Sequence, residues 1–319
     1  MRPLAVVTGA STGIGFHTAG QLAEKGYDVV LACRRPDRAY EVMNSIRDWY
    51  GNWIPVEFAE LDLASFSSVQ AFASSLSSRH DSLDLLVCNA GVNSASVHQE
   101  PEAQLSEDGV DVLYQTNFLS HLLLVLLLLP LLRAALRGGR VVNVSSVVHR
   151  SADPDHFRLV QSVREPYTSF YGLSKLAQIV TAPELHRHFS RQGVSFHCVN
   201  PGGVSSDIWR DYGSWQQFLF GLVLASPETA AKTVVEASQC AEGRRGSSPK
   251  YWNGYMGASR SSLFEYWSPR PARDCLVASE PSVDARDPEL GRQVFEDSIA
   301  VFRAAGIDIG LDDHELVVA

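Results

Sequence analysis

Short apolar runs alternate with longer stretches of mixed polarity along most of the chain. The runs with the length of strands are 4–9, 28–34, 56–63, 83–91, 139–146 and 194–202. The stretches between them predict helices, the first three beginning near residues 13, 37 and 66. Such alternation is typical of a parallel sheet, and near-continuous apolar strands indicate that both faces are covered. The pattern therefore predicts an α/β fold, a doubly wound parallel sheet with helices on both faces.

The pattern changes after residue 240. Residues 241–285 are rich in Gly, Ser and Pro, which indicates irregular chain. A last helix is expected near Asp287 and Pro288, because Asp is a good helix cap and Pro suits the first helical position. We therefore expect one domain over residues 1–240 and a C-terminal extension over 241–319.

Composition narrows the class of protein. The 319 residues are 45% hydrophobic and 20% charged, as in ordinary globular proteins. A net charge of −9 argues against a nucleic-acid partner, because phosphate binding needs concentrated Lys and Arg. The cysteines are widely spaced and odd in number, which indicates reduced and mostly buried thiols. They are Cys33, Cys88, Cys198, Cys240 and Cys275.

Two apolar stretches bear on a membrane location. Residues 121–132 and 218–226 are both shorter than the ~20 residues that span a bilayer. The stretch 218–226 could pack in the core, or its apolar surface could bind a lipophilic substrate, a partner or, as a peripheral contact, a membrane face. The first apolar run begins at Leu4 without room for a signal peptide, so we expect a cytoplasmic protein. The histidines form no metal-binding motif, so most are expected at the surface or as caps, and no metal is predicted.

A glycine-rich turn directly follows the first apolar run. It reads TGASTGIG from Thr8 to Gly15 and opens the first expected helix. Glycines there let backbone N–H groups approach a pyrophosphate at the helix N-terminus. A glycine-rich turn alone could be only a tight turn, but its place between strand and helix indicates a dinucleotide site.

The end of the second apolar run indicates which dinucleotide. An acidic residue there would bond a ribose 2′-hydroxyl, whereas a basic one would pair with a 2′-phosphate. This chain has Arg34 and Arg35, whose guanidinium groups suit a phosphate. NADP(H) is therefore favoured over NAD(H). The alternative is that both arginines are solvated charges at the start of a loop.

The spacing TGxxxGxG and the motifs after it resemble the short-chain dehydrogenase/reductase family. The later motifs follow in that family's order: Asp62-Leu63, Asn89-Ala90-Gly91, Asn117, Ser146, Tyr171 with Lys175, and Pro201-Gly202. The resemblance covers about residues 3–240. It implies a Rossmann-like fold and an oxidoreductase that moves hydride between a nicotinamide cofactor and an alcohol or carbonyl.

The resemblance also assigns residues to the cofactor. Asp62 and Leu63 would flank the adenine, although Asp62 could equally cap a helix. Ser206 stands where the family usually has Thr. The full expected set is Gly9, Ser11, Thr12, Gly13, Ile14, Gly15, Arg34, Arg35, Asp62, Leu63, Asn89, Ala90, Gly91, Tyr171, Lys175, Pro201, Gly202, Val204 and Ser206.

Four residues are expected to be catalytic. Tyr171 and Lys175 are four apart, so they share a helix face, and a nearby ammonium lowers the pKa of a phenol. The resemblance makes Tyr171 the proton donor. It makes Ser146, rather than its neighbour Ser145, the group that holds the substrate oxygen. In the family this Asn holds a water that links the lysine to solvent, so the resemblance implies this role for Asn117. Alternatively, Asn117 could form a hydrogen bond at a kink in its helix.

The separation of 25 residues between Ser146 and Tyr171 is long for the family. It resembles the branch of retinol dehydrogenases, the WW-domain oxidoreductase and protochlorophyllide reductases, although Gly203 stands where the last carries Cys. The branch implies an apolar substrate, such as a retinoid, steroid or other lipid-like carbonyl or alcohol. The family also implies a homodimer contact through the helix containing 121–132. An NADP(H)-binding regulatory or scaffold protein with little turnover is the alternative.

Overall fold

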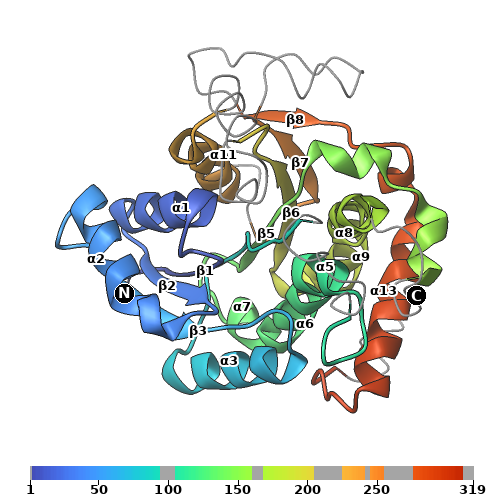
Figure 1. The fold of residues 1–319 in the computed structure, drawn as a ribbon, viewed down its shortest axis with the longest axis horizontal. Coiled ribbons are helices and arrows are strands. Elements are labelled where there is room, and N and C mark those ends of the chain that lie inside the picture. The colour runs from blue at the N-terminus through green and yellow to red at the C-terminus, as the bar shows by residue number, and fades with distance from the viewer. Residues whose placement is uncertain are drawn as a thin grey trace.

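The computed structural model describes residues 2–93, 105–159, 168–204, 225–240, 245–254 and 276–311. Over these ranges the chain builds one sheet in the order β3-β2-β1-β4-β5-β6-β7-β8 (Figure 1). Neighbouring strands are parallel except β8, which runs antiparallel to β7. The strands are Leu4–Thr8 (β1), Asp28–Cys33 (β2), Val56–Glu60 (β3), Leu85–Cys88 (β4), Arg140–Val144 (β5), Ser195–Asn200 (β6), Lys250–Asn253 (β7) and Val277–Ser279 (β8).

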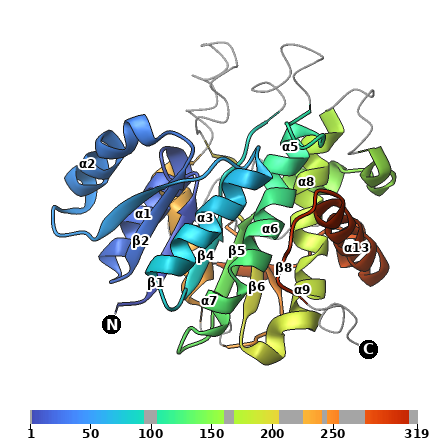
Figure 2. The same ribbon diagram turned by 90° about the horizontal axis from the view of Figure 1, so that it is seen from below.

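Helices cover both faces of this sheet, which confirms the predicted fold class (Figures 1 and 2). One layer holds α1 (Gly13–Glu24), α2 (Ala39–Tyr50) and α11 (Pro227–Gln239). The other holds α3 (Phe66–Arg79), α5 (Val112–Tyr114), α6 (Ser120–Leu127), α7 (Leu129–Arg133), α8 (Thr168–Val180), α9 (Ala182–Phe189) and α13 (Pro288–Ala304). A π-helical turn over Gln115–Leu119 joins α5 to α6. Short 3-10 turns lie at Pro36–Arg38, Val147–Ser151, Pro154–Leu159, Ser190–Gln192 and Asp284–Arg286.

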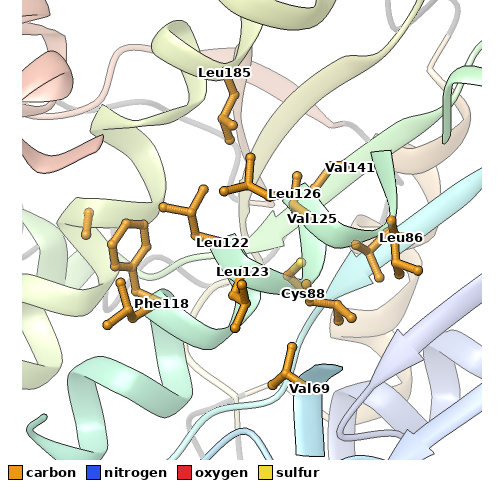
Figure 3. Close-up of a cluster of buried hydrophobic side chains, with 14 of the residues drawn as sticks. Val69, Leu86, Cys88, Phe118, Leu122, Leu123, Val125, Leu126, Val141 and Leu185 are labelled. Carbon is orange, nitrogen blue, oxygen red and sulfur yellow. The ribbon is translucent and has the colours of Figure 1, made fainter. Parts of the chain in front are cut away.

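Strand β1 shows why the sheet requires two helical layers. Side chains alternate between the faces of a strand. Ala5 and Val7 therefore join the core beneath α1, α2 and α11, whereas Leu4 and Val6 join the core of the other layer. Figure 3 shows part of that second core, which includes Leu86 and Cys88 of β4 together with Leu122, Leu123 and Leu126 of α6. Burial on both faces explains the near-continuous apolar runs in the sequence.

The segment expected to be irregular, 241–285, contributes two strands instead. β7 pairs in parallel with β6, and β8 pairs with β7. Tyr251 and Trp252 of β7 are both buried, one in each core, so this strand is anchored on both faces. Four residues between Gly/Ser/Pro-rich stretches were too short a run to recognise in the sequence. Residues 241–244 and 255–275 lie outside the described residues.

The terminal helix α13 begins where the sequence predicted. Asp287 caps it, accepting a 2.9 Å bond from the N–H of Glu289, and Pro288 is its first residue. Phe295 of α13 stacks on His188 of α9, and Phe302 meets Phe66 of α3 edge-on. The helix lies beside α8 and α9 at the side of this layer (Figure 2).

The leucine-rich helix α6 is buried within this one chain. Its residues 120–126 are all buried, and they belong to the core that α13 completes. The face that the resemblance assigns to a dimer contact is thus covered by the chain's own residues. Within the described ranges, no helix is long and apolar enough to cross a membrane. Most of the stretch 218–226 lies outside those ranges.

The cysteines and histidines differ in how well they match expectation. The described cysteines are free thiols; Cys33, Cys88 and Cys198 are buried and Cys240 is half-buried, as predicted. The histidines were expected mostly at the surface or as caps, and this was wrong. None of the described histidines is exposed, and four are buried: His121, His149, His188 and His197.

Candidate active site

The glycine-rich turn packs against the loop that follows β4. Gly9 and Gly13 have φ values of 65° and 58°, a conformation that favours glycine. A Cβ on Gly9 would lie only 2.8 Å from Cα of Ala90, and one on Gly15 would overlap the side chain of Asn89. These contacts explain the glycine spacing and bring two predicted cofactor segments together.

The N-terminus of α1 is open to an anionic ligand. Thr12 precedes it in an extended conformation without a side-chain capping bond, and the first turn contains no acidic residue. Thr12 is exposed, while Ser11, Gly13 and Ile14 are partly exposed. Backbone N–H groups and the positive end of the helix dipole favour a phosphate at such a terminus. The turn therefore fits the pyrophosphate of a dinucleotide.

Arg34 and Arg35 are exposed at the carboxyl end of β2. Arg35 forms an ion pair with Asp37 at 2.8 Å, which raises the pKa of the guanidinium and lowers that of the carboxyl. Both side chains of this pair are 61% exposed, and exposed pairs are weak. A ligand phosphate could therefore replace Asp37 as the partner of Arg35.

Asp62 and Leu63 lie at the end of β3. The Oδ1 of Asp62 accepts a 2.9 Å bond from the N–H of Ala64, so its carboxylate shapes the turn. The cap of α3 is Ser65, whose hydroxyl accepts from the N–H of Ser68, and not Asp62. The side chain of Leu63 is buried in the core, so only its backbone could meet an adenine.

Thr8 fixes the loop after β4 to the end of β1. Its Oγ1 accepts bonds from the N–H groups of Asn89 and Ala90, at 2.9 and 3.0 Å. The side chain of Asn89 donates in return to the carbonyl of Thr8 at 2.9 Å. A Cβ on the next residue, Gly91, would lie 3.7 Å from Nζ of Lys175. The loop therefore links the glycine-rich turn to the lysine.

Asn117 is the junction between this loop and α8. Its Oδ1 accepts from the N–H of Val92 at 2.8 Å, and its Nδ2 donates to the carbonyl of Val92 and to Oγ of Ser174. Its own carbonyl accepts from Nε2 of Gln178 at 2.8 Å. Asn117 sits in the π-helical turn, a feature frequent at functional sites. The distortion expected of a kinked helix is thus present at this residue.

Tyr171 and Lys175 lie on one face of α8, with Nζ 5.7 Å from the centre of the phenol ring. Lys175 is buried, and its Nζ donates a 2.8 Å bond to the carbonyl of Val144. Burial lowers the pKa of Lys175 to about 8. The ammonium therefore still prevails at neutral pH, where it favours the phenolate form of a neighbouring phenol.

The two serines that end β5 have different surroundings. The hydroxyl of Ser145 is buried and donates to the carbonyl of Lys175 at 2.9 Å. Ser146 is partly exposed, and its Oγ accepts a long bond of 3.5 Å from the N–H of Val148. Accepting that bond leaves the O–H of Ser146 able to donate to another oxygen. The geometry thus suits Ser146 to a ligand and Ser145 to holding α8.

The segment after β6 contains the last predicted cofactor residues. The N–H of Gly202 donates to Oδ1 of Asn200 at 3.2 Å, and its φ of 94° again favours glycine. Pro201 and Val204 are buried, and Val204 bridges to Ala225. Ser206 lies outside the described residues.

Sequence reasoning missed several residues that hold this site together. Asn117 is contacted by Ser174, Gln178 and His121, and Oγ1 of Thr8 lies 2.9 Å from Nε2 of His121. The only sequence signal was helical spacing: His121 is four residues after Asn117. Ser174 and Gln178 are likewise three and seven residues after Tyr171. These partners are recognisable only once the elements are packed.

The predicted residues gather at the carboxyl edge of the sheet. The glycine-rich turn follows β1, residues 89–91 follow β4 and Ser146 follows β5. The strand order reverses direction between β1 and β4, and doubly wound sheets bind ligands at such a point. The edge combines an anion-binding turn with a phenol, a buried ammonium and a hydroxyl. It can hold a dinucleotide and exchange a proton with an oxygen atom. Among the described residues, no three His, Cys, Asp or Glu side chains form a set of metal ligands.

Three relatives are similar in sequence to this chain over most of its length. Polyprenol dehydrogenase of Mus musculus is 38% identical over 96% of this chain and 85% of its own length. The human retinol dehydrogenase 13 is 30% identical over 92% of this chain and 82% of its own. The WW domain-containing oxidoreductase of Gallus gallus is 36% identical over 74% of this chain and 58% of its own. The resemblance to the retinol dehydrogenase branch is thereby confirmed.

A solved structure and a family profile also match this chain. L-sorbose reductase from Gluconobacter frateurii, solved with NADPH and L-sorbose, superposes with a TM-score of 0.60 and 25% identity over 81% of this chain and 97% of that one. The sequence profile of the short chain dehydrogenase family matches residues 3–217. Together with the glycine-rich turn and the Tyr171–Lys175 pair, these matches show that the chain is a member of the short-chain dehydrogenase/reductase family of NAD(P)-dependent oxidoreductases.

Proposed function

We propose that this protein is an NADP(H)-dependent enzyme that interconverts an alcohol and its carbonyl on an apolar, lipid-like substrate of the retinoid, steroid or polyprenol type. The observation that carries the proposal is the Tyr171–Lys175 pair beside the glycine-rich turn. A protein that only bound the dinucleotide would have no use for a phenol beside a buried ammonium. A catalytic role is therefore favoured over a regulatory or scaffold role.

Proton transfer in this site follows from the residues present. In the reducing direction Tyr171 donates its phenolic proton to the carbonyl oxygen, and the O–H of Ser146 bonds the same oxygen. Bound NADPH supplies the hydride. The charge of Lys175, held by the carbonyl of Val144, stabilises the phenolate that remains. In the oxidising direction Tyr171 takes the proton back from the alcohol.

The choice of NADP(H) rests on Arg34 and Arg35. Both are exposed where the 2′-phosphate of the dinucleotide would lie. The ion pair between Arg35 and Asp37 is weak enough for that phosphate to replace Asp37. We expect the double variant Arg34→Ala/Arg35→Ala to bind NADPH about tenfold or more weakly and to bind NADH almost as well as wild type. Calorimetric titration with both dinucleotides measures this. Arg38→Ala, which removes a side chain bonded to Glu41, is the matched control. Equal losses for NADPH and NADH would contradict the assignment.

The apolar substrate is proposed from the relatives. Two of them are named for polyprenol and retinol, which are both isoprenoid alcohols. The test is NADPH oxidation by the purified protein with retinal, a polyprenal and a hydrophilic aldehyde as control. We expect turnover on an apolar aldehyde and a loss of roughly 10²-fold to 10⁴-fold in Tyr171→Phe. Tight NADPH binding without turnover on any carbonyl would instead support the regulatory role.

A further inference from the structure

A buried histidine joins the two halves of the site. His121 lies in the first turn of α6 and is 1% exposed. Its Nε2 is 2.9 Å from Oγ1 of Thr8, at the end of β1. Its Nδ1 is 3.1 Å from the carbonyl oxygen of Asn117, one helical turn earlier. Both partners are themselves completely buried, so water cannot replace either of them.

The partners fix which nitrogen of His121 carries the proton. A carbonyl oxygen can only accept, so Nδ1 donates to Asn117. Oγ1 of Thr8 already accepts from the N–H groups of Asn89 and Ala90, so its own proton is what it can offer to Nε2. The other acceptor near that hydroxyl, the carbonyl of Val87, is farther away at 3.3 Å. Every donor in this chain of bonds then has one acceptor.

A charged imidazole does not fit this position. A second proton on Nε2 would point at a hydroxyl oxygen whose lone pairs are already taken. Burial, together with the charge of Lys175 nearby, lowers the pKa of His121 to about 4. The ring is therefore neutral at physiological pH, with its proton on Nδ1.

The chain of bonds runs from the cofactor turn to the catalytic helix. Asn89 and Ala90, which pack on the glycine-rich turn, donate to Thr8, which donates to His121, which donates to Asn117. The carbonyl of Asn117 also accepts from Gln178 of α8, the helix that carries Tyr171 and Lys175. A displacement of one end is thus transmitted through short, directional bonds.

We propose that His121 is a positioning residue that couples the dinucleotide-binding turn to the helix bearing Tyr171 and Lys175. The inference rests on the proposed function, because it assigns His121 a task in holding the same cofactor and catalytic groups. Losing the coupling should therefore weaken dinucleotide binding and lower kcat in the same variant, although His121 contacts neither the dinucleotide nor the substrate.

Two substitutions each keep one half of the bridge. In His121→Asn the amide can still donate to Asn117 but is too short to reach Thr8. In His121→Gln the amide can reach Thr8 but cannot also donate to Asn117. We expect each to raise the Kd for NADP⁺ and NADPH about tenfold, the size of effect expected for one lost buried hydrogen bond. Thr8→Val should have a larger effect, because it also removes the acceptor of the Asn89 and Ala90 N–H groups. Thr8→Ser keeps the hydroxyl and should be close to wild type.

The control is a histidine with the same burial elsewhere. His197 of β6 is 0% exposed, and its ring lies near Ser247 rather than the site. His197→Gln should lower thermal stability without changing the Kd of either dinucleotide. If the His121 variants behave like His197→Gln, losing stability but binding NADP(H) as tightly as wild type, then His121 is structural only and the proposal is overturned.

A second measurement does not depend on the cofactor. In ¹⁵N-histidine-labelled protein, long-range ¹H–¹⁵N spectra should show His121 with a protonated Nδ1 and a bare Nε2, unchanged between pH 8 and pH 5. A proton on Nε2, or a charged ring at pH 6, would contradict the assigned direction of the bonds. If wild-type protein binds neither NADPH nor NADH while this tautomer is present, the proposed function fails and the coupling falls with it. If wild-type protein binds NADPH normally and the His121 variants bind it equally well, the coupling is overturned while the proposed function stands.

Discussion

Lys175 meets two opposing demands at the scale of a single residue. The proposed reaction needs its positive charge beside Tyr171, whereas burial disfavours that charge and lowers its pKa from 10.5 to about 8. Such a shift corresponds to about 3 kcal/mol of lost stability while the lysine is charged in the folded protein. Its one described acceptor, the carbonyl of Val144, offsets part of this cost. Stability therefore does not explain a lysine at this position, whereas the proposed reaction does.

Replacing Lys175 should make the protein more stable and inactive. We expect Lys175→Met to abolish turnover and to raise the free energy of unfolding at pH 7, because it removes a buried charge at similar volume. Between pH 8 and 10.5 the unfolded wild-type chain binds more protons than the folded one, so wild-type stability rises with pH there. The advantage of the variant should accordingly shrink over this range.

Urea denaturation at pH 7 and at pH 10 measures this difference. The control is Lys232→Met, which removes an exposed ammonium from α11. A stability difference between Lys175→Met and wild type that stays constant from pH 7 to pH 10 would contradict the assignment of a buried charge to Lys175.

At the scale of an element, the glycine-rich turn depends on contact as much as on backbone conformation. Gly9 and Gly26 both have positive φ, 65° and 92°. A Cβ on Gly9 would press on the backbone of Ala90, whereas a Cβ on Gly26 would have nothing within 4 Å. The two positions therefore separate the cost of an unusual φ from the cost of disturbing the cofactor loop.

The pair Gly9→Ala and Gly26→Ala tests that separation. Both should lose about 1 kcal/mol of stability from the strained backbone. Only Gly9→Ala should also lose dinucleotide binding, because it pushes the loop at Asn89 and Ala90 away from the turn. Thermal unfolding and NADPH titration of both variants give the comparison. Unimpaired NADPH binding by Gly9→Ala would show that the close approach does not shape the site.

At the scale of the whole molecule, α13 completes a layer that begins more than two hundred residues earlier in the chain. Its Phe295 and Phe302 reach α9 and α3, and between these ends the helix contributes to the core that contains α6. The C-terminal residues are thus part of the main core and not an appendage to it. Because the chain itself buries residues 120–126 of α6, no second copy is required to cover them.

Removing the anchor of α13 should therefore open the core to which α6 belongs. Phe302→Ala should lower the free energy of unfolding by about 3–5 kcal/mol, as expected for a fully buried aromatic side chain. Wild-type protein should sediment as a monomer, and the variant should bind an apolar dye and self-associate. Substitution of the exposed Leu136 by Ala is the control, with little expected effect. A wild-type dimer that persists unchanged in Phe302→Ala would contradict this account of α6.

The sequence alone determined the features that depend on neighbouring residues. Apolar runs predicted the strands through β6, because burial on both faces of a parallel sheet demands continuous apolar residues. Asp287 and Pro288 predicted the start of α13, because capping is a local interaction. The four-residue spacing of Tyr171 and Lys175 predicted that they share a helix face, because helical periodicity is also a local property. These predictions needed no knowledge of distant contacts.

Only the tertiary structure decided what joins distant parts of the chain. Four residues of β7 become a strand because β6 and β8 pair with them on either side. Helix α13 packs against α8 and α9 because these helices bury apolar faces in one core. Thr8 and His121 meet across 113 positions, so no local pattern could pair them. Hydrogen bonds and apolar contacts act over a few ångströms in space, and only the folded chain sets which residues lie that close.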